Sequence, residues 1–160
     1  MNRSGFSSVT SLGVTRDADY PDDPAAGDEV TAPAAFQSVC TALAHVKLPV
    51  PTAPIIKATG NPNVSVFILP DCQLPGMLED VCVASIQSGP EVGCMDDYFN
   101  CLARVTGRTH LRRNLAKSRV HAWLAAQAEP DRRLSEAAEA GYWNWDSPAF
   151  GQLKQFLSAL

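Results

Sequence analysis

Four carboxylates stand where this chain could do chemistry, at the ends of predicted strands and at the start of a predicted helix. Asp17 and Asp19 are two residues apart, so their side chains point to the same side while the chain stays extended. Asp71 ends the next predicted strand, and Glu79 opens the helix after it. Because ligands of open α/β sheets bind at the carboxyl ends of the strands, we expect parallel strands to bring all four acids to one edge.

These acids predict a divalent metal site. Carboxylates packed together repel one another unless a cation or protons neutralise them. Mg²⁺ and Mn²⁺ are hard cations that take oxygen ligands in octahedral geometry, usually one or two carboxylates with water and substrate phosphate. The alternative is that the D-x-D sequence of Asp17 and Asp19 serves as a turn and helix-capping device, since Asp favours such positions.

A basic stretch lies C-terminal to the acids. It runs from residue 104 to residue 119 and holds no Asp or Glu. Arg112, Arg113 and Arg119 are candidates for binding phosphates, and Lys117 is a candidate for stabilising the charge of a phosphoryl-transfer transition state. The alternative is an ordinary solvated helix face, or a face that pairs with the acids. His121, on the same predicted helix, is expected to be a hydrogen-bonded packing residue rather than a base.

Composition and charge limit the class of protein. The 160 residues suit one domain, and the 46% apolar and 19% charged fractions are those of a soluble globular protein. Nothing approaches ~18 consecutive apolar residues, and the N-terminal residues do not resemble a signal peptide, so we expect no membrane span and a cytoplasmic location. The net charge of −4 argues against a general nucleic-acid coat. Neither a nucleotide P-loop, a dinucleotide fingerprint nor a G-x-S-x-G turn occurs.

The five cysteines predict neither a disulfide framework nor a zinc ribbon, because their count is odd and no C-x-x-C pair occurs. Cys40, Cys82 and Cys101 fall at apolar-periodic helical positions and are expected in the core. Cys72 follows Asp71 directly, and a reactive thiol is the alternative to a structural one at this position.

The pattern of apolar residues alternates between strand and helix and then becomes helical throughout. Strands are predicted at 9–15 and 64–69, with a short one at 55–56, and a mobile loop at 20–33. Helices are predicted at 33–46, 78–86, 95–105, 114–128, just before Gly141, and from Ser147 to Leu160. Trp143 and Trp145 are expected to fill a junction between helices. We therefore predict one α/β domain over 1–160, with a mainly parallel sheet flanked by helices and a helical C-terminal part at 94–160.

Four segments carry a resemblance that extends over most of residues 5–160. They are S-L-G-V-T-R-D-A-D at 11–19, L-P-D at 69–71, P-G-M-L-E-D at 75–80 and K-S-R-V-H-A-W-L-A at 117–125. Together they resemble an uncharacterised bacterial family related to the Toprim domains of topoisomerases, primases and overcoming-lysogenisation-defect nucleases. The resemblance implies a Toprim-like fold, in which Asp17 and Asp19 match the D-x-D metal-binding motif. Asp71 and Glu79 recur in the resembling family, and their metal role is inferred from the expected geometry.

The chain departs from the Toprim pattern at its start. A Toprim domain begins with a strand and a turn that carries a proton-transferring Glu, whereas residues 1–8 hold neither Glu nor Asp. We therefore expect a truncated, degenerate or mis-started reading frame, or a partner chain that supplies the missing part. A sheet that lacks a strand also leaves backbone groups that favour association with another chain or a second copy.

Three functions follow from these features. The first is a nuclease-type domain that cleaves phosphodiesters of nucleic acid with Mg²⁺ or Mn²⁺ and is impaired by the absence of the Glu. The alternative is a non-catalytic interaction module that partners an ATPase or another chain in a phage-defence-type system, by analogy with related nuclease systems. The third is an inactive remnant that folds without a present task.

Overall fold

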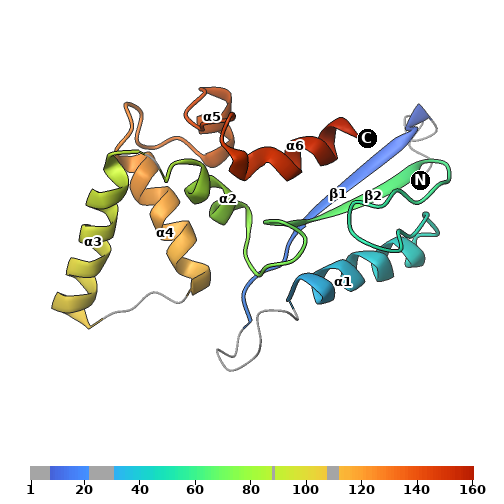
Figure 1. Cartoon of the computed structure of the whole chain (residues 1–160), viewed down its shortest axis with the longest axis horizontal. Helices are drawn as coiled ribbons and strands as arrows, with labels where there is room; N and C mark the ends of the chain where they lie inside the picture. Colours follow the sequence, from blue (N-terminus) through green and yellow to red (C-terminus); the bar gives the residue numbers. More distant parts are fainter. Residues whose placement is uncertain (1–7, 22–30, 88, 108–111) are drawn as a thin grey trace. The chain divides into compact units, whose positions relative to one another are not determined.

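A computed structural model describes residues 8–21, 31–87, 89–107 and 112–160 (Figure 1). The chain divides into two compact units, which we name the sheet unit (Met1–Met77 with Gln152–Leu160) and the helical unit (Leu78–Gly151). The sequence predicts a single domain with a helical part at 94–160, and the described elements of the helical unit are helices from Leu78 onward. Most of the loop predicted at 20–33 lies outside the described residues. None of the described helices is long and apolar enough to cross a membrane.

The sheet unit is built on one strand–helix–strand element. β1 (Ser11–Asp17) and β2 (Asn63–Leu69) run parallel, with Asp17 opposite Leu69. α1 (Thr31–His45) lies between them in sequence, since a parallel pair requires a crossover connection. The prediction of an α/β fold with parallel strands is thus confirmed. Within the described residues the sheet has two strands.

The short strand predicted at 55–56 is not a strand. Ile55 and Ile56 are exposed, and Ile55 lies in a turn. The segment nevertheless bonds to β2, because the Ile55 N–H donates to the Val66 carbonyl at 2.8 Å and Ala58 forms an isolated bridge with Val64. Alternate residues of β2 bond to β1, so these contacts occupy the edge of β2 that β1 does not use.

β2 is buried on both faces, as its continuous apolar sequence predicts. One face, with Val66 and Ile68, packs against α1 in the hydrophobic core. On the other face the Phe67 ring lies 5.4 Å from the ring of Phe156, which belongs to α6 (Gly151–Ser158). The strand therefore lies between two helical layers, with α1 and α6 on opposite sides of it (Figure 1).

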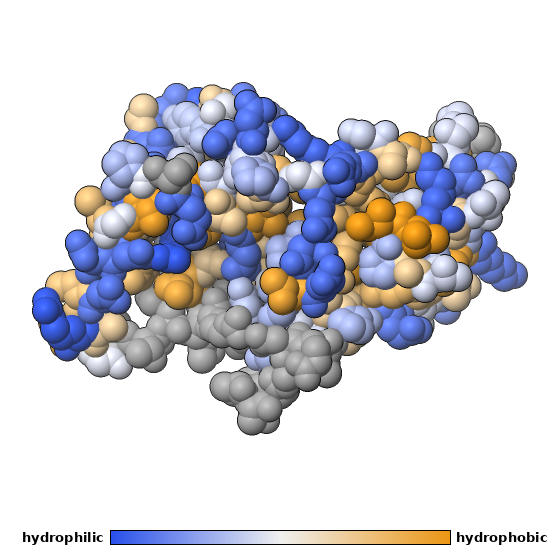
Figure 2. All heavy atoms as spheres, viewed as in Figure 1, coloured by the Kyte–Doolittle hydropathy of each residue, from blue (hydrophilic) through white to orange (hydrophobic). Residues whose placement is uncertain are grey.

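Some apolar residues of the predicted helices are exposed. Val46 is 60% exposed because α1 ends at His45, so the helical period no longer places residue 46 on the buried face. Leu157 and Leu160 are exposed as well, since Phe156 is the buried residue of α6. Figure 2 shows hydrophobic residues in small groups among hydrophilic ones on the visible face.

The helical unit contains the helices that the sequence predicts, within a few residues at each end. They are α2 (Leu78–Ser85), α3 (Glu91–Thr106), α4 (Arg112–Ala125), α5 (Leu134–Glu139) and the short 3-10 helix η3 (Pro148–Phe150). α3 ends at Gly107, whose φ of +65° is the left-handed conformation that glycine adopts without steric cost.

Tryptophan side chains hold the helical unit together. Trp123 of α4 stacks on Trp143 with ring centroids 4.5 Å apart, and both rings are buried. Trp145 is 42% exposed and packs against Phe150 at 4.8 Å. The prediction that these residues fill a junction between helices is confirmed for Trp143, whereas Trp145 covers only the edge of the core.

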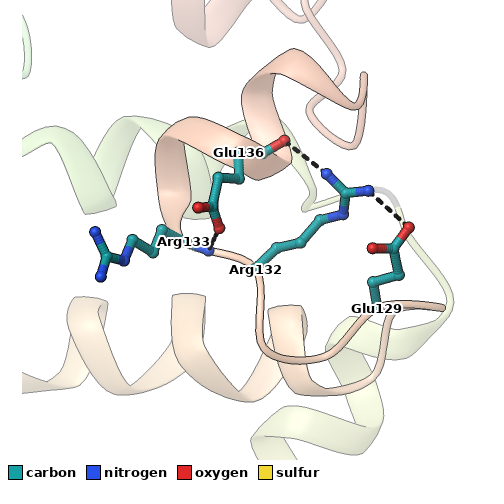
Figure 3. Close-up of polar contacts among 4 residues, drawn as sticks. All are labelled: Glu129, Arg132, Arg133 and Glu136. Carbon is teal, nitrogen blue, oxygen red and sulfur yellow. Dashed lines mark hydrogen bonds and ion pairs between the residues drawn. The ribbon is translucent and has the colours of Figure 1, made fainter.

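Charged residues fix the turn between α4 and α5 (Figure 3). Arg132 donates to the Glu129 carboxylate at 2.6 Å and to the Glu136 carbonyl at 3.4 Å. The Glu136 side chain accepts from the backbone N–H of Arg133 at 2.8 Å, which satisfies a donor at the start of α5. The Arg132 guanidinium also lies 5.6 Å from the centre of the Tyr142 ring, so one side chain connects both sides of the turn.

The cysteines divide by burial. Cys40 and Cys82 are buried, as predicted. Burial raises the pKa of Cys40. It raises the pKa of Cys82 to about 12, with a smaller contribution from the charge of Glu79. Cys101 is exposed, contrary to prediction, because Met95 is the buried residue of α3. Burial also raises the pKa of the half-buried Cys72, an effect that the Asp71 charge reinforces and a hydrogen bond from the Ile68 N–H partly opposes. These surroundings favour a structural thiol at Cys72.

Thiol alkylation tests this division. The thiolate is the nucleophile, so a pKa raised to about 12 leaves roughly a thousandfold less thiolate at Cys82 than an ordinary thiol has at pH 8. We expect iodoacetamide to modify Cys94 and Cys101 first, Cys72 more slowly, and Cys40 and Cys82 only after unfolding. Peptide mass spectrometry over time measures the order. Modification of Cys72 as fast as the exposed thiols would instead support a reactive cysteine.

The contact between β2 and α6 tests the layer structure. Phe67 has no exposed surface, so Phe67→Ala is expected to lower the free energy of unfolding by about 3–5 kcal/mol, measured by urea denaturation. Combined with Phe156→Ala, a double-mutant cycle should give a coupling of about 0.5–1.5 kcal/mol. Leu157→Ala is the matched control, because Leu157 follows Phe156 on α6 but is exposed. A coupling near zero would contradict the packing of α6 on β2.

Candidate metal and phosphate site

A hollow lies at the carboxyl end of β1, against the first turns of α1. Its volume is about 370 Å³, and its polar lining comes from Arg16, Asp17, Asp19, Tyr20 and Thr31. The structure thus brings two of the predicted metal ligands together. Their position at the end of a parallel strand is the one at which α/β sheets bind ligands.

The backbone around Asp17 and Asp19 is tied to β2 and to the segment that follows it. The N–H of Ala18 donates to the Leu69 carbonyl at 2.9 Å, which continues the ladder one residue past β1. Asp19 and Gly76 then exchange two backbone hydrogen bonds of 2.8 and 3.0 Å. These bonds hold the two aspartates at fixed positions.

Asp17 and Asp19 line the same hollow, but the backbone does not stay extended between them as the sequence predicts. β1 ends at Asp17, and Asp19 has a φ of +61°, so the chain between them is not extended. Left-handed backbone is tolerated by Asp better than by most residues. Asp17 is half-buried and Asp19 is exposed, which leaves the Asp19 carboxylate accessible to solvent.

Arg16 belongs to the same lining as the two aspartates. The Arg16 guanidinium donates to the Ser38 hydroxyl of α1 at 2.7 Å, which ties β1 to α1. Thr31 opens α1, a helix of fifteen residues with no acid in its first turn. Backbone N–H groups in the first turn of a helix have no partner within the helix, and they carry the positive end of the helix dipole. The hollow therefore combines two carboxylates, a guanidinium-bearing residue and the positive end of a helix dipole.

Asp71 is placed differently. Its Oδ1 accepts from the backbone N–H groups of Gln73 at 3.0 Å and Leu74 at 2.8 Å, which makes a turn after β2. It lines a second hollow of about 650 Å³, together with Cys72, Gln73 and Gln155 among others. The structure does not place Asp71 in the lining of the Asp17–Asp19 hollow.

The remaining predicted ligand, Glu79, belongs to a different unit from Asp17, Asp19 and Asp71. Glu79 lies in the first turn of α2, in the helical unit. Among the described residues, no group of three or more His, Cys, Asp or Glu side chains is arranged to hold a metal ion. Of the predicted ligands, Asp17 and Asp19 line one hollow, whereas Asp71 accepts hydrogen bonds from the backbone of its own turn.

The basic candidates belong to α4 in the helical unit. Arg119 forms an ion pair with Asp96 of α3, which matches the alternative that the basic residues pair with acids. Lys117 and His121 are exposed, so the expectation that His121 is a packing residue is wrong. Arg112 and Arg113 begin α4, and their side chains lie outside the part that the structure describes.

Sequence reasoning missed part of the hollow. Arg16 and Tyr20 flank the D-x-D sequence, and Thr31 opens the helix that follows it. Their adjacency to the two aspartates in the sequence could have identified Arg16 and Tyr20 as lining residues. The signal for Thr31 is the rule that a ligand at the end of a strand meets the start of the following helix.

Comparison with known proteins gives a family and no function. Neither a curated protein nor a solved structure shows significant similarity to the chain. The family described as "Protein of unknown function (DUF3226)" matches residues 2–160. Since that match spans almost the entire sequence, the chain belongs to the DUF3226 family.

Proposed function

We propose that the sheet unit is a Toprim-like domain that uses Mg²⁺ or Mn²⁺ to bind and cleave phosphodiesters of nucleic acid. The observation that carries the proposal is that Asp17, Asp19 and the first turns of α1 line one hollow at the carboxyl end of β1. The D-x-D sequence and its resemblance to the Toprim motif support the same assignment.

The residues of the hollow suit such a metal. Two carboxylates are the usual protein contribution to a Mg²⁺ site, with water and substrate oxygens as the remaining ligands. Asp17 is half-buried and its position is fixed by the ladder, and Asp19 is exposed, so the Asp19 carboxylate is accessible to solvent and substrate. Arg16 belongs to the same lining, and we propose that its positive charge limits the repulsion between the two carboxylates.

A division of roles follows. A bound Mg²⁺ or Mn²⁺ supplies Lewis-acid polarisation of a phosphodiester oxygen. Asp17 and Asp19 hold the cation, and the first-turn N–H groups of α1 bind phosphate oxygens. Arg16, kept in place by Ser38, neutralises charge that develops on the phosphate.

Proton transfer is the step for which the described residues of this site are least suited. Among the described residues that line the hollow, none is Glu, His or Lys. We propose that the chain alone is a slow enzyme and that a second chain, a nucleic-acid group or water transfers the proton. The basic residues of α4 remain candidates for contacts with the polymer backbone, namely Arg112, Arg113, Lys117 and Arg119. Arg119 is the weakest candidate because it already pairs with Asp96.

A non-catalytic interaction module is the second candidate. The observation that favours it is that two predicted site residues are engaged inside the fold, Asp71 by backbone N–H groups and Arg119 by Asp96. In that case the domain would bind an ATPase or another chain of a phage-defence-type system, or a second copy of itself.

Metal binding is tested by thermal unfolding with and without Mg²⁺ or Mn²⁺. A cation at about ten times its Kd stabilises the folded state by about 1.4 kcal/mol, so we expect the Tm of the wild type to rise by about 3–6 °C. Asp17→Asn and Asp19→Asn should abolish the rise, since each removes a charged ligand at constant size. Asp71→Asn is the matched control and should keep the rise, because Asn can accept the same two backbone hydrogen bonds. No rise in the wild type at millimolar metal would refute the metal site.

Cleavage is tested separately with supercoiled plasmid and single-stranded DNA. We expect slow Mn²⁺-dependent nicking that EDTA stops and that Asp17→Asn or Asp19→Asn lowers at least about tenfold, since each removes a group that holds the cation. Metal-dependent stabilisation without any nicking would favour the interaction module. Under that outcome, the contact with a co-purifying chain should persist in both variants.

A further inference from the structure

A third hollow lies in the helical unit between α3 and α4, which pack against each other (Figure 1). Its volume is about 350 Å³, within the range of small-molecule sites. Its lining includes Glu91, Cys94, Met95, Tyr98, Ala122 and Trp123. It shares no residue with the hollow of Asp17 and Asp19.

The walls of this hollow are fixed. Met95 and Trp123 are buried, and the Trp123 ring stacks on Trp143 at 4.5 Å. The Trp123 indole N–H donates to Glu91 Oε1 at 2.9 Å, which sets the position of the ring and of the carboxylate together. Tyr98 is exposed beside them. Ala122 is small, so α4 leaves space between the larger side chains.

The hollow carries a single kind of fixed charge. Hydrogen bonds from the Trp123 indole and from the Glu91 backbone N–H lower the pKa of Glu91, so its carboxylate is ionised at neutral pH. No Lys, Arg or His is among the described residues of the lining. A bound anion would meet this carboxylate with no compensating charge, whereas a cation would gain an ion pair.

We propose that this hollow binds a small organic cation that carries an aromatic ring. The ring lies against the apolar lining from Met95 and Ala122, and the cationic group lies beside Glu91 and the faces of Trp123 and Tyr98. Aromatic faces attract cations through their negative electrostatic potential, an effect best developed for Trp and for quaternary ammonium groups. The volume holds one such molecule, which favours a small ligand over a helix of a partner protein.

Cys94 supplies a local reporter, because it is exposed and lines the hollow. Cys101 is exposed on the same helix and does not line it, so it serves as an internal reference. The probe is benzyltrimethylammonium, which is a permanent cation and does not react with alkylating agents. Benzyl alcohol supplies the same ring without charge, and tetramethylammonium chloride controls for salt.

The experiment measures the rate of alkylation of each cysteine by iodoacetamide in the full chain. A small ligand of this size is expected to bind with a Kd on the order of 1 mM. At several times that concentration benzyltrimethylammonium should slow modification of Cys94 at least threefold and leave Cys101 unchanged. Benzyl alcohol should give less than half of this protection.

Two variants locate the effect. Glu91→Gln keeps an acceptor for the Trp123 N–H but removes the charge, so it should erase the preference for the cation over benzyl alcohol. Ala122→Leu should fill the hollow and remove protection by both compounds, and circular dichroism reports whether each variant folds. Equal protection by both compounds in the wild type would show an apolar surface without selectivity for a cation and would overturn the proposal. Absence of protection by benzyltrimethylammonium at 20-fold the expected Kd would overturn it as well.

Discussion

Burial of β2 on both faces is the constraint on which the sheet unit depends. Its alternate residues pack against α1 on one side, and Phe67 meets Phe156 of α6 on the other. Complete burial requires that the backbone groups of the strand be bonded, and they are, to β1 along one edge and to the segment around Ala58 along the other. A strand held in this way fixes where β1 ends, and therefore where Asp17 lies.

The candidate site uses the polar ends of this apolar framework. The Ala18 N–H donates to the Leu69 carbonyl, which extends the ladder past β1. Two backbone hydrogen bonds between Asp19 and Gly76 then hold the chain that follows. Polar side chains then gather where the strand meets the start of α1, without entering the core. Two carboxylates and the amino end of a helix lie in one hollow, and this is the arrangement from which we propose a cation and phosphate site.

The sequence predicts the elements better than their side-chain geometry. The apolar run at 64–69, the helix starts and the parallel α/β arrangement follow from periodicity, since burial depends on which face an apolar residue occupies. The pairing of Asp17 with Asp19 follows from spacing, although Asp19 leaves the extended conformation. The positions of Asp71 and Arg119 do not follow, because each depends on a local partner: a backbone turn for Asp71, and Asp96 on another helix for Arg119. A sequence pattern does not reveal which of several partners a charged side chain takes.

The central claim is that a divalent cation binds beside Asp17 and Asp19. Paramagnetic broadening of backbone amide signals by substoichiometric Mn²⁺ tests it most directly, because broadening falls steeply with distance from the ion. The account predicts the strongest broadening at the amides of Ala18, Asp19 and Ala34, which surround the hollow. Broadening that is strongest at Gln73 and Leu74, whose amides mark Asp71, or an absence of broadening near Asp19, would contradict it.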